Sequence, residues 1–440
     1  MTTERTLAAF VADLTTDDIL AAVRDRAGLT VADTLGVILG GSADPMVRSL
    51  VGRWGETVAG STTVLGNSAI TTAPHLAAFC NGTAGTVLEL DEGHRYAAGH
   101  PAIHVLPALL AEAEVDYGSG DDFLRSFVAG YEVAVRTARA TRPLADGYHP
   151  HGVWGAVGGA AAIARHRELD VDTTQTAMAI AANYAQHTRF AAATEGATLR
   201  NGYAGMSNLA ALVAVDQAEA GFTGLADGVS RHLNPAAADG FDEAALAADL
   251  GSRWELRRGY FKIHAACRYT HPVLDAIGAV RAEVDPGTVE SVTVETYPAA
   301  ARLTETRPRS ALQAKFSIPF AVATTLLTGE TGPGAFDADA ITPQATALAE
   351  RVTVSVGEEF AARAPDRRGA RVTVNLGDEL VSATVQAPRG GEHDPFTESR
   401  LREKFRSITT PVVGPDRADD LWESARSLEP PRVLCALAQG

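Results

Sequence analysis

The sequence has very little lysine. Only Lys262, Lys315 and Lys404 are found among 38 basic residues, so arginine carries nearly all of the positive charge. Lysine differs from arginine because it titrates more readily and presents a compact point charge. Lys262 begins the polar segment 262–272, which predicts a functional role for it. Lys404 is expected to lie on the surface of a helix.

Cysteine and long apolar runs are also scarce. The three cysteines, Cys80, Cys267 and Cys435, are too far apart for a zinc ribbon, and their scarcity suits a reducing cytoplasm without disulfide bonds. The first residues lack the basic and apolar regions of a signal peptide, and no uninterrupted apolar run reaches membrane-spanning length. We therefore expect a cytoplasmic protein with no membrane partner.

The formal net charge of −16 shows a deficit of positive charge. Nucleic acids and anionic membranes bind basic patches, so neither is expected as a partner. A small anionic substrate is still compatible, because a pocket can be basic inside an acidic shell. A chain of 440 residues with 46% hydrophobic residues predicts a globular protein of two or three domains.

Several common catalytic motifs are missing. The sequence contains no Gly-x-Ser-x-Gly elbow, no Walker loop and no Gly-x-Gly-x-x-Gly after a predicted strand. These absences argue against a serine hydrolase, an NTPase and a Rossmann dehydrogenase. The His-Glu-x-x-His motif of zinc hydrolases is missing too.

The first part of the chain has helical periodicity. One helix is predicted to start after Thr30 and to end at Gly40 and Gly41, and another to start at the acidic pair Asp121 and Asp122. The Gly/Ala-rich segment 152–164 predicts a helix that packs closely against its neighbours. Residues 1 to about 265 are therefore expected to be mostly α-helical.

The pattern changes near residue 285, where apolar and polar residues begin to alternate. This alternation predicts four strands, and a short turn at 377–379 predicts that the last two form a hairpin. Helical stretches are expected at 271–284, 317–329 and 337–350. Together they indicate an antiparallel sheet with helices on one face.

Helical character returns from Pro395 to the end of the chain. We therefore predict a mainly α-helical large domain made of residues 1–268 and 396–440, with an α+β domain inserted at 269–395. Small-molecule sites often lie between such domains, so the interdomain cleft is the expected position of a site.

Histidines cluster in three short segments: His94, His100 and His104; His149 and His151; His264 and His271. The spacing of His100 and His104 could place two imidazoles on one helical face for a metal, with Asp91 or Glu92 as further ligands. However, Pro101 disfavours helical geometry at His100, so acid–base chemistry without a metal or other cofactor is favoured. His149 precedes the Gly/Ala helix, whose amino terminus attracts anions.

These segments, in this order, resemble the MmgE/PrpD family, which includes 2-methylcitrate dehydratases, cis-aconitate decarboxylase and an iminodisuccinate epimerase. The resemblance implies a large helical domain completed by the carboxyl terminus, an α+β lid and a homodimer. The matching segments are Glu89–Arg95 with His100-Pro101, Gly130–Ala134, His149-Pro150 with Gly152, Gly221–Gly224, Lys262 with Cys267–Pro272, and Lys315–Ser317.

The resemblance also implies the site residues. Catalysis is expected from His100, His149 and Lys262. Substrate contacts are expected from Asp91, His94, Arg200, Arg268, Tyr269, His271, Lys315 and Phe320. Three positions depart from the decarboxylase branch: Arg200 replaces a lysine, Phe320 a tyrosine and Cys267 a histidine. These departures argue against decarboxylation of cis-aconitate.

The resulting hypothesis is a metal-independent lyase, most simply a dehydratase, that acts on a small polycarboxylate or hydroxy acid. Lys262, Arg268 and Arg200 would bind the carboxylate and stabilise developing charge. Of His100 and His149, one would take the carbon-bound proton and the other would protonate the leaving hydroxyl, with the order left open. The alternatives are an isomerase, a decarboxylase and a non-catalytic binding protein on the same fold.

Overall fold

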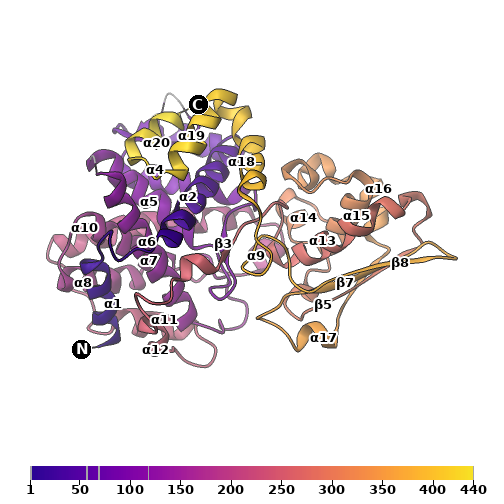
Figure 1. Cartoon of the computed structure of the whole chain (residues 1–440), viewed down its shortest axis with the longest axis horizontal. Coiled ribbons are helices and arrows are strands. Elements are labelled where there is room, and N and C mark those ends of the chain that lie inside the picture. Colours follow the sequence, from indigo (N-terminus) through magenta and orange to yellow (C-terminus); the bar gives the residue numbers. More distant parts are fainter. Residues whose placement is uncertain (1, 56–57, 68–69, 117, 440) are drawn as a thin grey trace.

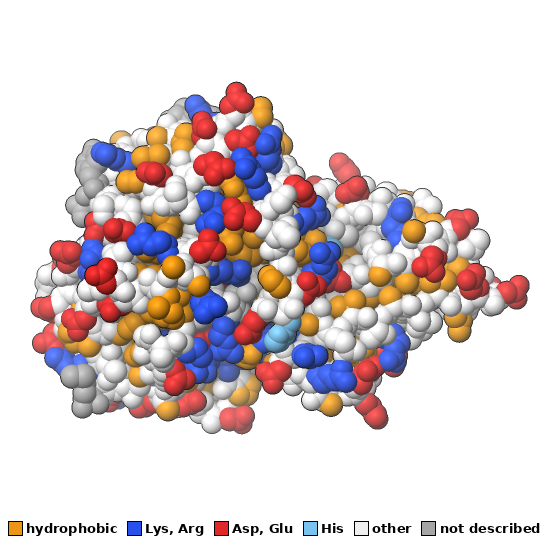
Figure 2. All heavy atoms as spheres, viewed as in Figure 1, with side chains coloured by type: hydrophobic (Ala, Val, Ile, Leu, Met, Phe, Trp, Pro, Cys, Tyr) orange, Lys and Arg blue, Asp and Glu red, His pale blue; other side chains and the backbone are white. Residues whose placement is uncertain are grey.

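The computed structural model describes residues 2–55, 58–67, 70–116 and 118–439. Figure 1 shows a larger helical part, which contains both ends of the chain, and a smaller part, which contains a four-stranded sheet. The two parts are joined through a narrower middle (Figures 1 and 2). No helix among the described residues is both long and apolar enough to cross a membrane.

The helical part is built from two regions of the sequence. The carboxyl-terminal helices return to the amino-terminal ones: α18 packs on α2, and α20 packs on α5 (Figure 1). Its main helices are α1 (Thr3–Asp13), α2 (Ala21–Ser42), α3 (Pro45–Gly55), α4 (Pro74–Val87), α5 (Pro101–Asp116), α6 (Gly120–Ala140), α7 (Gly155–His166), α8 (Val171–Asn183), α10 (Tyr203–Glu219), α18 (Glu398–Val413), α19 (Pro415–Arg426) and α20 (Pro431–Leu437).

Several helices begin where a polar side chain accepts a hydrogen bond from a backbone N–H of the first turn. Helix α6 begins with a capping box, in which the side chains of Ser119 and Asp122 each accept from the other's backbone N–H, so its predicted acidic start is confirmed. The predicted start of α2 is wrong. The helix begins at Ala21, and Thr30 lies inside it with its hydroxyl donating to the Arg26 carbonyl, 2.9 Å away.

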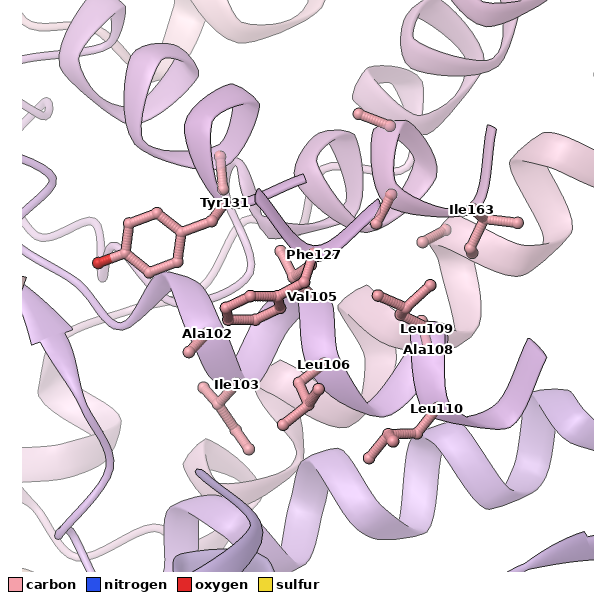
Figure 3. Close-up of a cluster of buried hydrophobic side chains, with 14 of the residues drawn as sticks. Ala102, Ile103, Val105, Leu106, Ala108, Leu109, Leu110, Phe127, Tyr131 and Ile163 are labelled. Carbon is pink, nitrogen blue, oxygen red and sulfur yellow. The ribbon is translucent and has the colours of Figure 1, made fainter. Parts of the chain in front are cut away.

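Small residues allow α6 and α7 to approach closely, as the Gly/Ala-rich segment predicted. A Cβ atom on Gly158 would lie 2.5 Å from Cβ of Ala134, and one on Gly130 would lie 2.6 Å from Cβ of Ala162. Both distances are too short for real side chains. Figure 3 shows apolar side chains of α5 packed with Phe127 of α6 and Ile163 of α7 in the core of the helical part.

The sheet has the strand order β6-β5-β7-β8. Its strands are β5 (Ser291–Thr296), β6 (Val352–Val356), β7 (Ala370–Asn375) and β8 (Leu380–Val385). The β7–β8 hairpin is confirmed, and β5 is antiparallel to β7. The prediction of a wholly antiparallel sheet is wrong, because β5 and β6 are parallel. A helical crossover joins these two strands, and such a connection permits parallel pairing.

Helices α13 (His271–Val280) and α15 (Ile318–Thr328) pack against the sheet, and between β5 and β6 the chain forms α14 (Ala311–Lys315), α15 and α16 (Pro343–Ala349). Alternate residues of β7 are buried, which explains its period of two. One apolar core fills the helical part and another lies under the sheet. The division of the chain at 268/269 and 395/396 stays a prediction.

Lys404 is buried, so its expected surface position is wrong. Its Nζ lies 2.6 Å from Oδ1 of Asp33 and donates to the Leu90 carbonyl at 2.8 Å. The lysine therefore ties α18 to α2 and to the loop after α4. The lysine can be buried at this position because its charge is paired and hydrogen-bonded there.

Candidate active site

A buried pocket lies where the loop after α4, the segment before α7 and the segment 260–269 meet. Its cavity volume is small, about 30 Å³. Its walls combine charged groups, imidazoles and aromatic rings, as is usual for a small-molecule site. The lining residues are Glu89, Ala98, His100, His149, Pro150, His151, Phe190, Arg200, Tyr260, Cys267, Arg268, Tyr269, Phe316 and Arg368.

The loop between α4 and α5 is held against the segment before the sheet. Gly93 and His94 (β3) pair antiparallel with Gly259 and Tyr260 (β4). The Tyr260 ring lies directly over Gly93, where a Cβ atom would come within 2.4 Å of its hydroxyl oxygen. This short ladder aligns two polar segments that are distant in the sequence, and both of them line the pocket.

Glu89 is the acidic centre of the pocket. Its Oε2 lies 2.6 Å from Nη2 of Arg200, and its Oε1 lies 3.3 Å from Nζ of Lys262. Burial by itself would raise the pKa of Glu89, but Arg200 and Lys262 outweigh it and hold this pKa below its usual value. The carboxylate is therefore ionised and cancels one of the two neighbouring positive charges.

Lys262 is completely buried and lies behind the pocket wall. Its Nζ donates to the Glu89 carbonyl at 3.0 Å and lies 3.4 Å from Oδ1 of Asp91. Neither Lys262 nor Asp91 lines the pocket. The structure thus places Lys262 next to Glu89, which lines the pocket, but not in the pocket lining itself.

His100 has a defined tautomer. Its Nδ1 lies 2.7 Å from the Glu92 carbonyl oxygen and 3.2 Å from Oδ2 of Asp91. Both neighbours accept hydrogen bonds, so Nδ1 carries the proton and Nε2 of the neutral ring has a free lone pair. Burial is the main cause that lowers the pKa of His100, and Asp91 opposes it. The neutral imidazole is therefore a base near neutral pH.

His149 has the opposite tautomer. The backbone N–H of His151 donates to its Nδ1 at 3.1 Å, so in the neutral ring the proton lies on Nε2. The ring stacks on Phe190 with centroids 5.4 Å apart. Burial holds the pKa of His149 well below its usual value, with a further contribution from Arg200. This side chain therefore presents a neutral N–H donor.

Two further imidazoles complete a buried row. The ring of His151 lies 4.6 Å from that of His100 and 5.0 Å from that of His104. Burial lowers the pKa of His104 to about 3 and that of His151 well below its usual value, so both are neutral. His151 lines the pocket, whereas His104 lies behind it.

Among the described residues, Asp91, His100 and His151 form a group of side chains that could hold a metal ion. Each offers a ligand atom, and these atoms lie within 4.8 Å of one another. This set differs from the His100 and His104 pair that the sequence spacing brought into question as a metal site. Lys262 already neutralises Asp91, and His100 Nδ1 donates to a carbonyl. Because a cation would have to displace these interactions, the donor set fits a divalent metal poorly.

Five of the predicted substrate contacts do not line the pocket, and Asp91 is one of them. His271 Nδ1 accepts from Nη1 of Arg268 at 3.1 Å, so His271 positions that arginine. Lys315 donates to the Val87 carbonyl at 2.9 Å, and Phe320 is buried against Phe336. His94 is the fifth. By contrast, Arg200, Arg268 and Tyr269 line the pocket as predicted.

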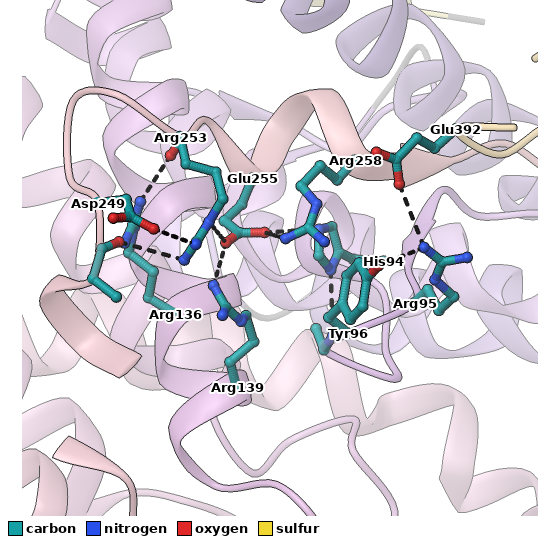
Figure 4. A network of polar contacts seen from close by, with 12 residues as sticks. His94, Arg95, Tyr96, Arg136, Arg139, Asp249, Arg253, Glu255, Arg258 and Glu392 are labelled. Carbon is teal, nitrogen blue, oxygen red and sulfur yellow. Dashed lines mark hydrogen bonds and ion pairs between the residues drawn. The ribbon is translucent and has the colours of Figure 1, made fainter. Parts of the chain in front are cut away.

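His94 belongs to a neighbouring ion-pair network. Its Nε2 lies 3.4 Å from Oε2 of Glu255, and Glu255 also pairs with Arg253 and Arg258, each at 3.1 Å, and with Arg139. Figure 4 shows Glu255 among these arginines with His94 beside it. The histidine therefore anchors the loop before His100 and does not face the pocket.

Several pocket residues were missed at the level of sequence. Glu89 and His151 lie within the family-like segments 89–95 and 149–152, and their polar side chains could have indicated a role in the site. Phe190, Tyr260 and Phe316 are aromatic residues without a motif of their own. Arg368 lies in an arginine-rich stretch just before β7 that has no catalytic pattern, so only the three-dimensional structure brings it to the pocket.

A helical part joined to a sheet-containing part, with a pocket of imidazoles and paired cations, defines a two-domain architecture with an enzyme-like site. The sequence matches the MmgE/PrpD N-terminal domain over residues 5–241 and the MmgE/PrpD C-terminal domain over residues 264–430. The chain belongs to the MmgE/PrpD family, which confirms the resemblance.

Similar proteins include cis-aconitate decarboxylases. The cis-aconitate decarboxylase-like protein oryM of Aspergillus oryzae is 28% identical, and the match covers 96% of this chain and 93% of that protein. Cis-aconitate decarboxylase of Aspergillus terreus is 25% identical over 96% of this chain and 92% of its own length. The Homo sapiens cis-aconitate decarboxylase is 27% identical, and the match covers 84% of this chain and 79% of that protein. These relatives are named as decarboxylases or as decarboxylase-like, and decarboxylases are lyases.

Proposed function

We propose that this chain is a lyase acting on a small polycarboxylate, with His100 and His149 as its acid–base pair. One observation carries the proposal: two neutral imidazoles with opposite tautomers line the same buried pocket. A lone pair on one ring and an N–H on the other are the two functions that proton removal next to a leaving group requires.

In the favoured reaction, His100 Nε2 removes a proton from the carbon next to a carboxylate. The electron pair of that C–H bond forms the C=C bond, and the C–O bond to the hydroxyl breaks. His149 Nε2–H donates a hydrogen bond to the departing oxygen, which becomes water with the proton that His100 took up. The hydrogen-bond partners of the two rings support His100 as the base and His149 as the donor to the leaving hydroxyl, an order that the sequence left open.

Arg200 would stabilise the charge that develops on the reacting carboxylate. Its guanidinium lines the pocket and is held by Glu89 and by the Thr86 carbonyl, 3.3 Å from Nη1. A donor fixed in a buried site costs little reorganisation in the transition state. Lys262 would act indirectly, by holding Glu89 and Asp91 in place.

Decarboxylation is the second candidate, because the similar proteins described above are cis-aconitate decarboxylases. In that reaction the C–C bond to a carboxylate breaks, carbon dioxide leaves, and the carbon that keeps the electron pair takes a proton. Of the three departures from the decarboxylase branch, Arg200 and Cys267 line the pocket and Phe320 does not. Because Arg200 and Cys267 line the pocket, they argue more strongly than Phe320 for a reaction other than decarboxylation.

The deciding experiment is to incubate chelator-treated protein with citrate, 2-methylcitrate and cis-aconitate and to follow product masses. Loss of water supports the dehydratase, whereas release of carbon dioxide supports the decarboxylase. Exchange of a carbon-bound proton for deuterium, without a change of composition, supports an isomerase. We expect activity to survive the chelator, and complete loss that returns with added metal would contradict the metal-free mechanism.

The roles of the two histidines are tested with His100→Gln and His149→Gln. Each variant should lower kcat about 10²- to 10⁴-fold on the substrate that the unmodified protein converts. His75→Gln is the matched control, because His75 pairs with Asp216 at 2.9 Å outside the pocket. If both folded site variants keep full turnover, the proposed acid–base pair is wrong.

The cytoplasmic location of the protein stays a prediction. We also propose that the chain forms a homodimer. Met46, Leu199 and Met206 are 50%, 64% and 42% exposed and line one hollow that is mostly apolar. Exposed apolar patches of this kind are common at subunit interfaces. Sedimentation velocity should show a dimer that Leu199→Glu dissociates, and a monomer at all concentrations would contradict the proposal.

A further inference from the structure

His151 is a buried polar side chain that the reaction described above does not use. Its exposure is 0%, and it lines the pocket together with His100 and His149. Among the described residues, neither Nδ1 nor Nε2 of its ring has a hydrogen-bond partner. Nearly all buried polar atoms in proteins have such a partner, because burial without one costs free energy. An imidazole at this position therefore does not serve stability, which indicates a function.

The backbone of His151, in contrast to its ring, is firmly held. Its N–H donates to Nδ1 of His149 at 3.1 Å, and its carbonyl accepts from the Thr188 hydroxyl at 2.6 Å. Gly152 follows with a φ of +88°, and a Cβ atom there would lie 2.9 Å from Nε2 of Gln186. The chain can turn at this point because the residue is glycine. The ring is thus fixed in position while its nitrogens stay available.

The ring of His151 is a neighbour of both proposed acid–base residues. Its centroid lies 4.6 Å from that of His100 and 5.0 Å from that of His149. The nearest ligand atoms of His100 and His151 are within 4.8 Å of each other. A proton can pass over such a distance through one water molecule. His151 is therefore placed to exchange a proton with each of the other two sites.

The three rings differ in their freedom to change tautomer. His100 holds its proton on Nδ1 against the Glu92 carbonyl, and His149 accepts at Nδ1 from the His151 backbone. Each of these two rings therefore has one nitrogen engaged with the backbone and one that faces the reaction. His151 has both nitrogens free among the described residues, so it can accept a proton on one and donate from the other.

We propose that His151 is a further catalytic residue, which carries the abstracted proton from His100 to the departing oxygen beside His149. The inference rests on the proposed function. The N–H bond on Nε2 of His100 breaks as an N–H bond forms on one nitrogen of His151. The N–H bond on the other nitrogen of His151 breaks as the departing hydroxyl becomes water. His151 is neutral before and after the transfer, and its tautomer is reset by exchange with water.

The surroundings of His151 favour a transfer in which it never stores the proton. Burial holds its pKa well below the usual value, and the positive charge of a protonated His100 acts in the same direction. A ring that gives one proton as it takes another carries no charge, so burial does not oppose it. His104 does not compete for the proton, because it lies behind the pocket and burial lowers its pKa to about 3.

The test replaces the ring of His151 by a small molecule. His151→Ala should lower kcat about 10²-fold on the substrate that the unmodified protein converts, with little change in KM. Added imidazole should raise kcat of this variant at least about tenfold, because it can both accept and donate a proton. Pyrrole has the same ring size and an N–H but no acceptor nitrogen, so it should not restore turnover. Equal restoration by both molecules would show that His151 only fills space and would overturn the proposal.

His104→Ala is the matched variant, because it also removes a fully buried imidazole but from outside the pocket lining. The two variants should show comparable falls in Tm, and kcat of His104→Ala should not rise with imidazole. Full turnover by folded His151→Ala would contradict the relay and leave the lyase intact. If the unmodified protein converts none of the tested acids, the lyase and the relay are both contradicted.

Nitrogen NMR of protein with ¹⁵N-labelled histidine tests the relay without a substrate. The signals of His151 are assigned by their loss in His151→Gln. Its two ring nitrogens should show the averaged shifts of exchanging tautomers, whereas His100 and His149 should each show one tautomer, protonated on Nδ1 and on Nε2 respectively. A single fixed tautomer at His151 would overturn the relay even if the protein is an active lyase.

Discussion

The guanidinium of Arg200 and the carboxylate of Glu89 form a buried ion pair, with Nη2 and Oε2 2.6 Å apart, although they come from distant parts of the chain. Glu89 follows α4, and Arg200 lies in the short helical turn η1 (Thr198–Gly202) before α10. The pair joins two walls of the pocket and leaves Arg200 facing its interior. It is therefore important both for folding and for the site.

Glu89→Gln should destabilise the fold by about 3–5 kcal/mol, because it leaves Arg200 buried without a counter-charge. Urea-induced unfolding measures this loss. The double variant Glu89→Gln with Arg200→Met should recover a large part of it, since both charges are then gone. If the double variant is as unstable as the sum of the two single variants, the ion pair does not have the proposed energetic coupling.

The pH dependence of catalysis follows from the low pKa of His100. As a base, His100 must be neutral, and burial lowers its pKa below the usual 6.5. The ratio kcat/KM should therefore be constant near neutral pH and should fall as the pH decreases through a value below 6.5. A pH series on the identified substrate checks this, and an acidic limb centred above pH 7 would be inconsistent with the assignment.

Lys262→Met should move this acidic limb to higher pH. The positive charge of Lys262 is one of the causes that lower the pKa of His100, after burial, so its removal raises that pKa. The same pH series measures the shift. Lys315→Met is the matched control, because it removes another buried lysine that lies off the pocket and donates to a carbonyl. Equal profiles in both variants would show that Lys262 does not influence His100.

Much of the fold could be predicted because local patterns reflect burial. The strands alternate because one face of the sheet packs on helices, and α6 starts where Ser119 and Asp122 can cap it. The parallel pairing of β5 and β6 could not be predicted, because it depends on how the crossover between them packs. Local propensity carries no information about that packing.

The site could be predicted only where its residues belong to motifs. His100, His149, Arg200, Arg268 and Tyr269 all line the pocket. Lys262 was expected to contact substrate, but it does not line the pocket, and its charge pairs with Glu89 and Asp91. Arg368 comes to the pocket through the position of the sheet-containing part, and no spacing in the sequence indicates that position.

The buried pair of Lys404 and Asp33 could not be predicted from the sequence either, because it joins residues from opposite ends of the chain. Lys404→Met should destabilise the fold by about 3–5 kcal/mol, since Asp33 then stays buried alone and the Leu90 carbonyl loses its donor. Urea-induced unfolding measures the loss, and adding Asp33→Asn should recover part of it.

The control for this prediction lies on the same helix. Arg406 pairs with Asp419 at 2.7 Å, but its side chain is 46% exposed. Arg406→Met should therefore cost no more than about 1 kcal/mol, because solvent screens an exposed pair. Equal losses for Lys404→Met and Arg406→Met would contradict the conclusion that burial of Asp33 makes the first pair important. A large difference would show that this lysine completes the helical part by attaching its carboxyl-terminal helices.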